Sequence, residues 1–326
     1  MDRELVMAKV VVTGKIPAIG LERLRAEHDV VAWEKDEVIS REELLNMVAG
    51  ADAIVSLLTE KIDDELLDAA GAQLKSVSNV AVGYNNVDVA ACTKRGVLVT
   101  NTPGVLTEAT ADIAMSLILM ATRRLGEGER VIRSQEPWQW GMFYMLGMGL
   151  QGRQLGIVGM GQIGIATARR AKAFGMNIAY TRRSPLEDHV IQELDAKFMS
   201  MDELIESSDV ISLHCPYSPT THHLFSENQF ARMKSTAYLI NTARGPIVDE
   251  AALVAALKNG QIAGAGLDVF EHEPKVHPGL LELDNAVLIP HLGSATVETR
   301  SAMADVAATN ALAILAGKTA PNLVTA

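Results

Sequence analysis

The stretch LGIVGMGQIGIATARRAKAF, residues 155–174, decides how this chain folds. An apolar run at 155–158 leads into the glycine pattern GMGQIG at 159–164, and a helix-like mixture of apolar and charged residues follows. A strand, a GxGxxG turn and a helix in this order form the phosphate-binding unit of dinucleotide-binding folds. There, Gly159 permits the tight turn, Gly161 lets a pyrophosphate approach the backbone, and Gly164 lets the helix pack on the strand. The amides of Gln162 and Ile163, at the start of the helix, would complete the phosphate site.

Apolar runs of the same kind occur on both sides of this unit. Helical segments separate the six runs of this C-terminal series, at 155–160, 177–181, 210–215, 237–243, 266–270 and 286–291. An earlier series has five runs, at 9–14, 29–33, 51–58, 74–82 and 96–101. Strands that are buried on both faces and alternate with helices are typical of open parallel sheets. The sequence therefore predicts an α/β protein with two doubly wound parallel sheets.

Composition excludes several classes of protein. The 326 residues are 48% hydrophobic and 21% charged, which is ordinary for a globular chain of about two domains. The net charge of −11 disfavours nucleic acid and anionic membranes as partners. We expect no membrane span and no metal site, and Cys92 and Cys215, which form no CxxC motif, favour a reducing cytoplasm.

The residues after the second strand of the dinucleotide unit predict which cofactor is bound. A carboxylate at this position accepts hydrogen bonds from the ribose of NAD, whereas arginine accommodates the 2′-phosphate of NADP. Here the strand ends in Arg182, Arg183 and Ser184, and no acidic residue follows until Glu187. Two guanidinium groups and a hydroxyl suit a phosphate dianion, so we predict that NADP(H) is preferred and that NAD remains possible. The alternative is a solvated basic loop.

Three further residues follow predicted strands of the same series, where doubly wound sheets place their chemistry. They are Arg244, Glu273 and His291. Taken singly, each could be a surface charge or a structural histidine. Together they suit the reduction of a carbonyl, because a histidine paired with a carboxylate donates a proton near neutral pH. The planar guanidinium would bind the carboxylate and carbonyl of a 2-oxo acid.

Longer motifs resemble the D-isomer-specific 2-hydroxyacid dehydrogenase family. They are NVAVGYNNVDVAAC (79–92), TPGVLTEATAD (102–112), LGIVGMGQIG (155–164), MKSTAYLINTARGPIVDEAALVAAL (233–257), GLDVFEHEP (266–274) and NAVLIPHLGSAT (285–296). The resemblance covers nearly the whole chain from about residue 50. It implies a Rossmann-like NAD(P)-binding domain at 104–291, inserted into a discontinuous flavodoxin-like substrate domain at 1–103 and 292–326.

The resemblance also implies roles for individual residues. Arg244, Glu273 and His291 match the family's catalytic positions. The backbone N–H groups of Val82 and Gly83 match its substrate-carboxylate loop, and Asp268 matches the residue that binds the carboxamide of the cofactor. Further cofactor contacts would come from Cys215, Pro216, Thr221, Thr242, Ala243, Arg244 and His291.

Within the family, the basic loop at Arg182 is most similar to glyoxylate/hydroxypyruvate reductases, including 2-ketogluconate reductases. We therefore expect NADPH-dependent reduction of glyoxylate, hydroxypyruvate or 2-ketogluconate. Two alternatives remain: an NAD-dependent dehydrogenase of another D-2-hydroxy acid, and a dinucleotide-sensing protein of the corepressor type. An NAD-using thioether hydrolase is disfavoured, because a longer chain is expected for it. Relatives dimerise through their cofactor domains, so we expect a homodimer in which the aromatic segment from Trp138 to Leu146 crosses to the second subunit, with Trp140 near its active site.

Overall fold

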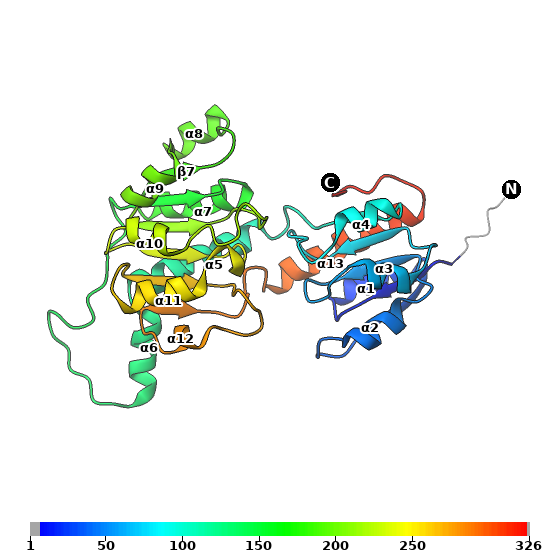
Figure 1. Cartoon of the computed structure of the whole chain (residues 1–326), viewed down its shortest axis with the longest axis horizontal. Coiled ribbons are helices and arrows are strands. Elements are labelled where there is room, and N and C mark those ends of the chain that lie inside the picture. The colour runs from blue at the N-terminus through cyan, green and yellow to red at the C-terminus, as the bar shows by residue number, and fades with distance from the viewer. Residues whose placement is uncertain (1–6, 325–326) are drawn as a thin grey trace. The chain divides into compact units, whose positions relative to one another are not determined.

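The computed structural model describes residues 7–324, which form two compact units (Figure 1). One unit combines the chain up to Leu106 with the chain from Ala295 onward. The other unit runs from Thr107 to Ser294. The substrate-binding and cofactor-binding roles that the sequence suggests for these segments stay predictions.

The discontinuous unit is built on a sheet of five parallel strands. They are β1 (Lys9–Val12), β2 (Asp29–Ala32), β3 (Ala53–Ser56), β4 (Ser76–Asn79) and β5 (Leu98–Thr100). Their order, β2-β1-β3-β4-β5, is that of flavodoxin-like sheets. Strands β3 and β4 are buried along their whole length, whereas the edge strand β2 is partly exposed. The core therefore lies on both faces of the sheet.

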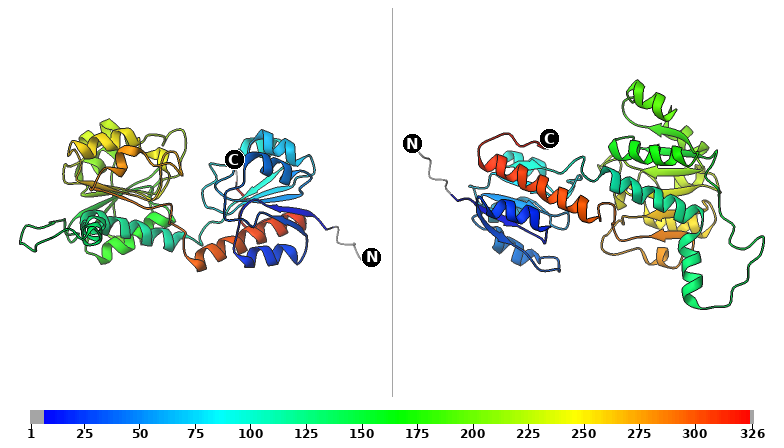
Figure 2. Two further views of the ribbon diagram at one scale, coloured as in Figure 1. Left: turned by 90° about the horizontal axis from the view of Figure 1, so that it is seen from below. Right: turned by 180° about the vertical axis from the view of Figure 1, so that it is seen from behind.

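Helices cover both faces of this sheet. Three pack on one face: α2 (Arg41–Val48), α3 (Asp64–Ala70) and α4 (Val89–Lys94). The other face is covered by α1 (Ala18–Arg25) and by α13 (Val297–Leu315), which returns from the far end of the chain (Figure 2). At Gly20 the two helices come so close that a Cβ would lie 2.9 Å from the carbonyl oxygen of Ala304. Glycine and alanine at this crossing let α13 act as an integral part of the unit.

The second unit is built on seven parallel strands. They are β6 (Gln154–Val158), β7 (Asn177–Thr181), β8 (Lys197–Phe198), β9 (Val210–Leu213), β10 (Tyr238–Asn241), β11 (Gly264–Leu267) and β12 (Ala286–Leu288). Their order is β12-β11-β10-β9-β6-β7-β8, so the chain winds outward from β6 in one direction and then from β9 in the other. This is the Rossmann order with one added edge strand, and ligands bind where the winding reverses. The two sheets confirm the predicted fold class.

Helices also cover both faces of the seven-stranded sheet (Figure 2). On one face lie α5 (Thr107–Thr122), α7 (Gln162–Ala173) and α8 (Asp188–Leu194). On the other face lie α9 (Met201–Ser207), α10 (Glu227–Arg232), α11 (Glu250–Lys258) and α12 (Pro278–Leu281). The apolar α5 packs against α7, β10 and β11, which explains its composition. Within residues 7–324, no helix combines the length and the apolar character needed to cross a membrane.

Two strands differ from the sequence-based expectation. Strand β8 has only two residues, both exposed, and so it lacks the apolar run that marks the other strands. Strand β11 begins at Gly264, ahead of the apolar run expected at 266–270, and ends at Leu267. The ladder starts early because Gly264 fits against β12, where a Cβ would lie 2.8 Å from the carbonyl oxygen of Asn285. The residues after Leu267 are thereby released to form the site described below.

The segment after α5 lies at the surface of the second unit. Helix α6 (Leu125–Ser134) has no buried residue, and residues 136–149, which we call the arm, form neither helix nor strand (Figure 1). The arm is rich in exposed apolar side chains: Trp140 is 73% exposed and Phe143 is 87% exposed. Trp138 stacks on Tyr144 with ring centroids 6.1 Å apart, which is a contact within the arm itself.

One histidine lies at the point where the winding of the seven-stranded sheet reverses. His214 follows β9, and its Nε2 lies 2.8 Å from the hydroxyl of Ser212. Burial lowers the pKa of His214 to about 4. An unfolded histidine has a pKa of about 6.5, so between these values only the unfolded chain takes up the proton. Stability should therefore fall as the pH is lowered through this window.

We expect His214→Asn to reduce this loss of stability. As the pH is lowered from 6.5 to 4, the free energy of unfolding of the wild type should fall by up to about 1.4 kcal/mol per pH unit because of His214. The variant should lack this contribution. Chemical denaturation at several pH values measures the difference. The exposed His189 offers the control, and a wild-type slope equal to that of His214→Asn would contradict the prediction.

Candidate active site

The glycine turn lies at the switch point between β6 and β9. Gly159 has a φ of +91°, and a Cβ there would lie 2.4 Å from the backbone nitrogen of Cys215, so only glycine fits. Around Gly161, the N-cap of α7, a Cβ would meet no atom within 4 Å, which leaves space for a ligand beside the backbone of Gln162 and Ile163. Gly164 packs on the turn, with its Cβ position 2.8 Å from the carbonyl oxygen of Gly159. This geometry fits a dinucleotide pyrophosphate at the start of α7.

The basic residues after β7 lie beside this turn. The Nη1 of Arg182 donates a hydrogen bond to the carbonyl oxygen of Met160 at 3.2 Å, and its Nη2 lies 3.4 Å from the hydroxyl of Ser184. Arg182, Arg183 and Ser184 are all exposed. The Met160 contact brings a guanidinium next to the glycine turn, while the exposed edge of the group stays accessible to a phosphate.

The loops after β9 and β10 contain the other residues expected at the cofactor. Cys215 contacts the turn, and burial raises the pKa of its thiol to about 11, so the group is a neutral thiol. Thr221 folds its loop back by donating a hydrogen bond from its hydroxyl to the carbonyl oxygen of Pro216 at 2.9 Å. The hydroxyl of Thr242, next to Ala243, is buried without a hydrogen-bond partner among residues 7–324. A ligand that donates or accepts a hydrogen bond there would satisfy it.

Glu273 and His291 come together at the carboxyl ends of β11 and β12. The Nδ1 of His291 lies 2.8 Å from Oε2 of Glu273, and Oε1 of Glu273 accepts a hydrogen bond from the backbone N–H of Phe270 at 2.9 Å. Burial by itself raises the pKa of Glu273, but these hydrogen bonds and the charges of His291 and Arg244 bring it below its ordinary value. Glu273 is therefore an ionised carboxylate at neutral pH, in direct contact with the imidazole of His291.

Asp268 has a role that the sequence did not suggest. Its carboxylate accepts hydrogen bonds from the backbone N–H groups of Leu292 at 2.5 Å and Gly293 at 2.8 Å. Its own carbonyl oxygen accepts the N–H of His291 at 2.9 Å, and His291 has a left-handed φ of +50°. Burial raises the pKa of Asp268 despite these bonds. Asp268 thus holds the segment that presents His291.

Arg244 follows β10 in a turn that Asn241 braces. The side chain of Asn241 accepts the N–H of Ala243 at 3.0 Å and donates to the carbonyl oxygen of Arg244 at 2.9 Å. Burial lowers the pKa of Arg244 and the charge of Glu273 raises it, with a net lowering. A Cβ on Gly245 would lie 1.9 Å from the carbonyl of Phe270, so this turn presses directly on the segment that leads to Glu273. Asn241 was missed because a buried strand-end asparagine has no motif of its own.

Val82 and Gly83 belong to the discontinuous unit, in the segment after β4. Asn101 donates a side-chain hydrogen bond to the carbonyl oxygen of Val82 at 2.8 Å, and Asn79 donates one to that of Gly83 at 3.1 Å. These two asparagines fix the course of the backbone at both residues. Neither was identified from the sequence as a supporting residue.

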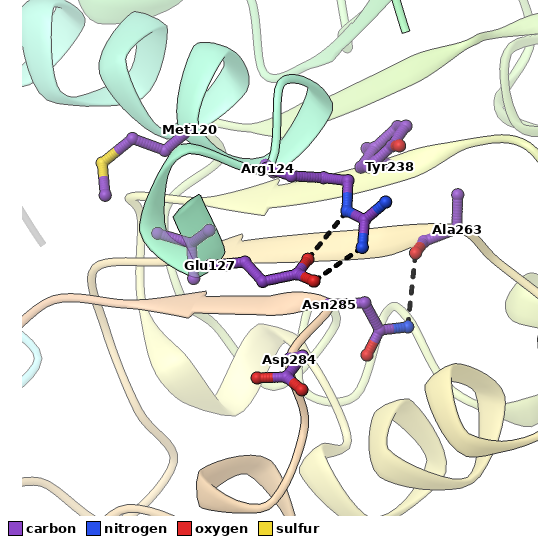
Figure 3. Close-up of a pocket in the computed structure, with 9 residues that line it drawn as sticks. Met120, Arg124, Glu127, Tyr238, Ala263, Asp284 and Asn285 are labelled. Atoms are coloured by element: carbon purple, nitrogen blue, oxygen red, sulfur yellow. Dashed lines mark hydrogen bonds and ion pairs between the residues drawn. The ribbon is translucent and has the colours of Figure 1, made fainter. Parts of the chain in front are cut away.

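A cavity at the amino ends of strands in the seven-stranded sheet is separate from the residues described so far (Figure 3). It is lined by residues from α5, α6 and the starts of strands, among them Met120, Tyr238 and Asn285. The charged groups there are paired: Arg124 donates two hydrogen bonds to Glu127, at 2.7 and 2.6 Å, and Arg130 pairs with Asp284 at 2.9 Å. The glycine turn and the Glu273–His291 pair lie at the other ends of the strands, so this cavity is not the candidate active site.

Comparison with known proteins agrees with this geometry. Residues 115–293 match the family model described as D-isomer specific 2-hydroxyacid dehydrogenase, NAD binding domain. The glyoxylate reductase of Thermococcus onnurineus is 49% identical over 321 residues, which cover 97% of this chain and 95% of the relative. The glyoxylate reductase of Korarchaeum cryptofilum is 48% identical over 320 residues, with coverage of 97% and 95%.

Solved structures agree as well. A glyoxylate reductase from Paecilomyes thermophila superposes with a TM-score of 0.89 at 35% identity, covering 98% of each chain. An NADPH-dependent glyoxylate/hydroxypyruvate reductase from Sinorhizobium meliloti, solved in complex with NADP and malonate, gives a TM-score of 0.84 at 36% identity and covers 98% of this chain and 97% of its own. The fold, the glycine turn and these similarities lead to one conclusion: the chain belongs to the D-isomer-specific 2-hydroxyacid dehydrogenases and is an NAD(P)-dependent oxidoreductase.

Proposed function

We propose that the protein reduces small 2-oxo acids with NADPH, glyoxylate and hydroxypyruvate first and 2-ketogluconate as a further candidate. The observation that carries this proposal is the 2.8 Å contact between Glu273 and His291, beside Arg244 and in the same unit as the glycine turn. The names of the relatives, glyoxylate reductase and glyoxylate/hydroxypyruvate reductase, support this class of substrate.

The chain's own residues would provide orientation and a proton. When bound, the reduced nicotinamide supplies the hydride that adds to C2 of the oxo acid. Arg244 binds the carboxylate and the carbonyl oxygen of the substrate and polarises the carbonyl as charge develops on it. His291 donates a proton to that oxygen, and the Glu273 carboxylate stabilises the protonated imidazole before transfer. Arg244 also keeps Glu273 ionised, because its charge lowers the pKa of that carboxyl.

Two further parts of the proposal rest on other residues. The backbone N–H groups of Val82 and Gly83 are assigned to the substrate carboxylate on the family resemblance alone. Arg182, next to the glycine turn, is assigned to the 2′-phosphate of NADPH, with Arg183 and Ser184 beside it. An NADP-bound relative of the same fold supports this assignment.

We also propose that the protein is a homodimer and that the arm makes the contact. The exposure of Trp140 and Phe143 to water is unfavourable. Burial of each such side chain would lower the free energy by about 1.5 to 3 kcal/mol. A second copy of the chain presents the same arm, so a two-fold contact would bury both sets of side chains together.

His291→Ala should reduce kcat for glyoxylate by about 10² to 10⁴ and leave NADPH binding nearly unchanged, because it removes the proton donor and leaves the glycine turn intact. Oxidation of NADPH, followed by its absorbance with and without glyoxylate, measures the rate. The exposed His272 provides a matched control, His272→Ala, which should retain full activity. Turnover of the His291 variant within a few-fold of the wild type would exclude His291 as the donor.

Glu273→Gln should move the alkaline fall-off of kcat to lower pH. The pKa of Glu273 lies below its ordinary value, so the group is a carboxylate at neutral pH, and a negative charge beside an imidazole favours the charged form of the ring. The neutral amide cannot do this. A pH profile of kcat measures the shift, and an unmoved alkaline limb would show that the carboxylate does not support proton donation.

Arg182→Asp combined with Arg183→Ala should raise the KM for NADPH at least about 10-fold more than the KM for NADH, since it removes charge-assisted contacts of about 1.5 to 3 kcal/mol each. Arg133→Asp, on the 80% exposed side chain of Arg133 in α6, is the control for the change in charge. Equal effects on the two cofactors would mean that Arg182 and Arg183 are solvated surface groups.

Trp140→Ser combined with Phe143→Ser should raise the dissociation constant of the dimer at least about 10-fold, because both copies lose two buried side chains. Sedimentation at several protein concentrations measures this constant. Leu281→Ser, a change at a 67% exposed apolar residue outside the arm, should leave it unchanged. A monomeric wild type at micromolar concentration would refute the role of the arm.

A further inference from the structure

A second histidine–carboxylate pair lies near the proposed catalytic residues and has no part in the mechanism above. The Nε2 of His223 lies 2.7 Å from Oε1 of Glu271, and the two side chains are 35% and 17% exposed. His223 belongs to the loop after β9, and Glu271 follows β11. The pair therefore links two segments that are 48 residues apart in the sequence.

Glu271 is anchored to the start of α11. Its backbone N–H donates to Oε1 of Glu250 at 2.7 Å, and the N–H of Glu250 approaches Oε2 of Glu271 at 3.5 Å. Glu250 itself is only 4% exposed. Glu271 also lies between Phe270, whose N–H binds the Glu273 carboxylate, and Glu273 itself. Any movement of Glu271 would therefore move the carboxylate that faces His291.

His223 is anchored to the turn that follows Arg244. Its N–H donates to the carbonyl oxygen of Pro246 at 2.8 Å, within the 3₁₀ turn η1 (Gly245–Ile247). A second contact with this turn comes from the N–H of Phe225, which donates to the carbonyl oxygen of Ile247 at 3.1 Å. The loop thus follows the backbone that leads away from Arg244, and Gly245 in turn presses on Phe270.

The backbone of His223 shows that its position is imposed by these contacts. It has a φ of +48°, a left-handed conformation that costs a non-glycine residue free energy and persists only where surrounding contacts hold it. Three groups surround its ring: Glu271, the ring of His222 stacked at 4.0 Å between centroids, and Oδ2 of Asp249 at 4.0 Å from Nδ1. Both nearby carboxylates therefore face this one histidine.

We propose that His223 and Glu271 are a positioning pair for the reaction. They join the loop after β9, the turn after Arg244 and the segment before Glu273, and so they set the Glu273 carboxylate against His291 and Arg244 beside it. This inference rests on the roles proposed above for Glu273 and Arg244. Neither His223 nor Glu271 touches the reacting atoms; their effect passes through the backbone of residues 244–246 and 270–273.

The test uses variants that separate the pair from the backbone around it. His223→Asn suits the left-handed backbone, since asparagine tolerates it, but its side chain is too short to reach Glu271. Glu271→Gln keeps the size and the backbone N–H of Glu271 and removes the charge. His223→Gln can still donate a hydrogen bond to Glu271 and should recover part of the loss. His189→Asn, at an exposed histidine in α8, is the matched control.

We expect His223→Asn and Glu271→Gln each to lower kcat by about 10-fold, because small misplacements of catalytic groups are costly. The alkaline limb of the pH profile should move in the same direction as in Glu273→Gln, while the dissociation constant of NADPH stays within about twofold. In a Glu273→Gln background, His223→Asn should cause no further shift of the limb, because the group it positions is gone.

The outcomes are distinguishable. If both variants lower only the midpoint of thermal unfolding and match His189→Asn in kcat and pH profile, the pair is merely structural and the inference is overturned. If Glu273→Gln moves the limb but His223→Asn and Glu271→Gln do not, the inference fails and the proposed function stands. If Glu273→Gln itself changes neither kcat nor the limb, the proposed role of Glu273 fails and the positioning pair fails with it.

Discussion

Two backbone N–H groups meet the buried carboxylate of Asp268, and the position of His291 depends on this contact. A buried carboxylate is costly without partners, so the amides of Leu292 and Gly293 are drawn to it. The carbonyl oxygen of Asp268 meanwhile accepts the N–H of His291. Bound on both sides, the segment keeps the left-handed backbone that presents the imidazole to Glu273. The other proposed catalytic groups, Glu273 and Arg244, can act in the proposed reaction only if the His291 imidazole is held in this position.

The same principle recurs in the neighbouring loops. A parallel sheet brings the carboxyl ends of its strands to one edge, but the loops that follow need their own supports. Asn241 supports the turn of Arg244, and Glu250 supports the segment of Glu271. Each support is a polar side chain that binds backbone atoms of the adjacent segment. These side chains fix the positions of the loops, although they need not touch a substrate themselves.

The sequence predicts the fold well because its signals are local. Strands buried on both faces appear as apolar runs. At Gly159, a strand, a GxGxxG turn and a helix follow one another in the order of a dinucleotide-binding unit. Prediction was weaker where small or polar residues form the strand, as at Gly264 in β11 and in the two-residue β8. The support residues Asn241 and Glu250 and the pair of His223 with Glu271 could not be found, because they meet only after the sheet has formed. The proposed roles of Arg244, Glu273 and His291 came from their places after predicted strands and from the family resemblance.

The return of α13 to the first sheet has a consequence for biosynthesis. Val10, Val12 and Val55 pack in one core with Ala304, Ala307 and Ala311 of that helix. A ribosome makes the strands of this unit early, but it delivers the helix that covers one face of them only after all of residues 107–294 have emerged. The second unit can therefore complete its fold while the first still exposes an apolar face. During synthesis, that face stays uncovered until α13 has been made.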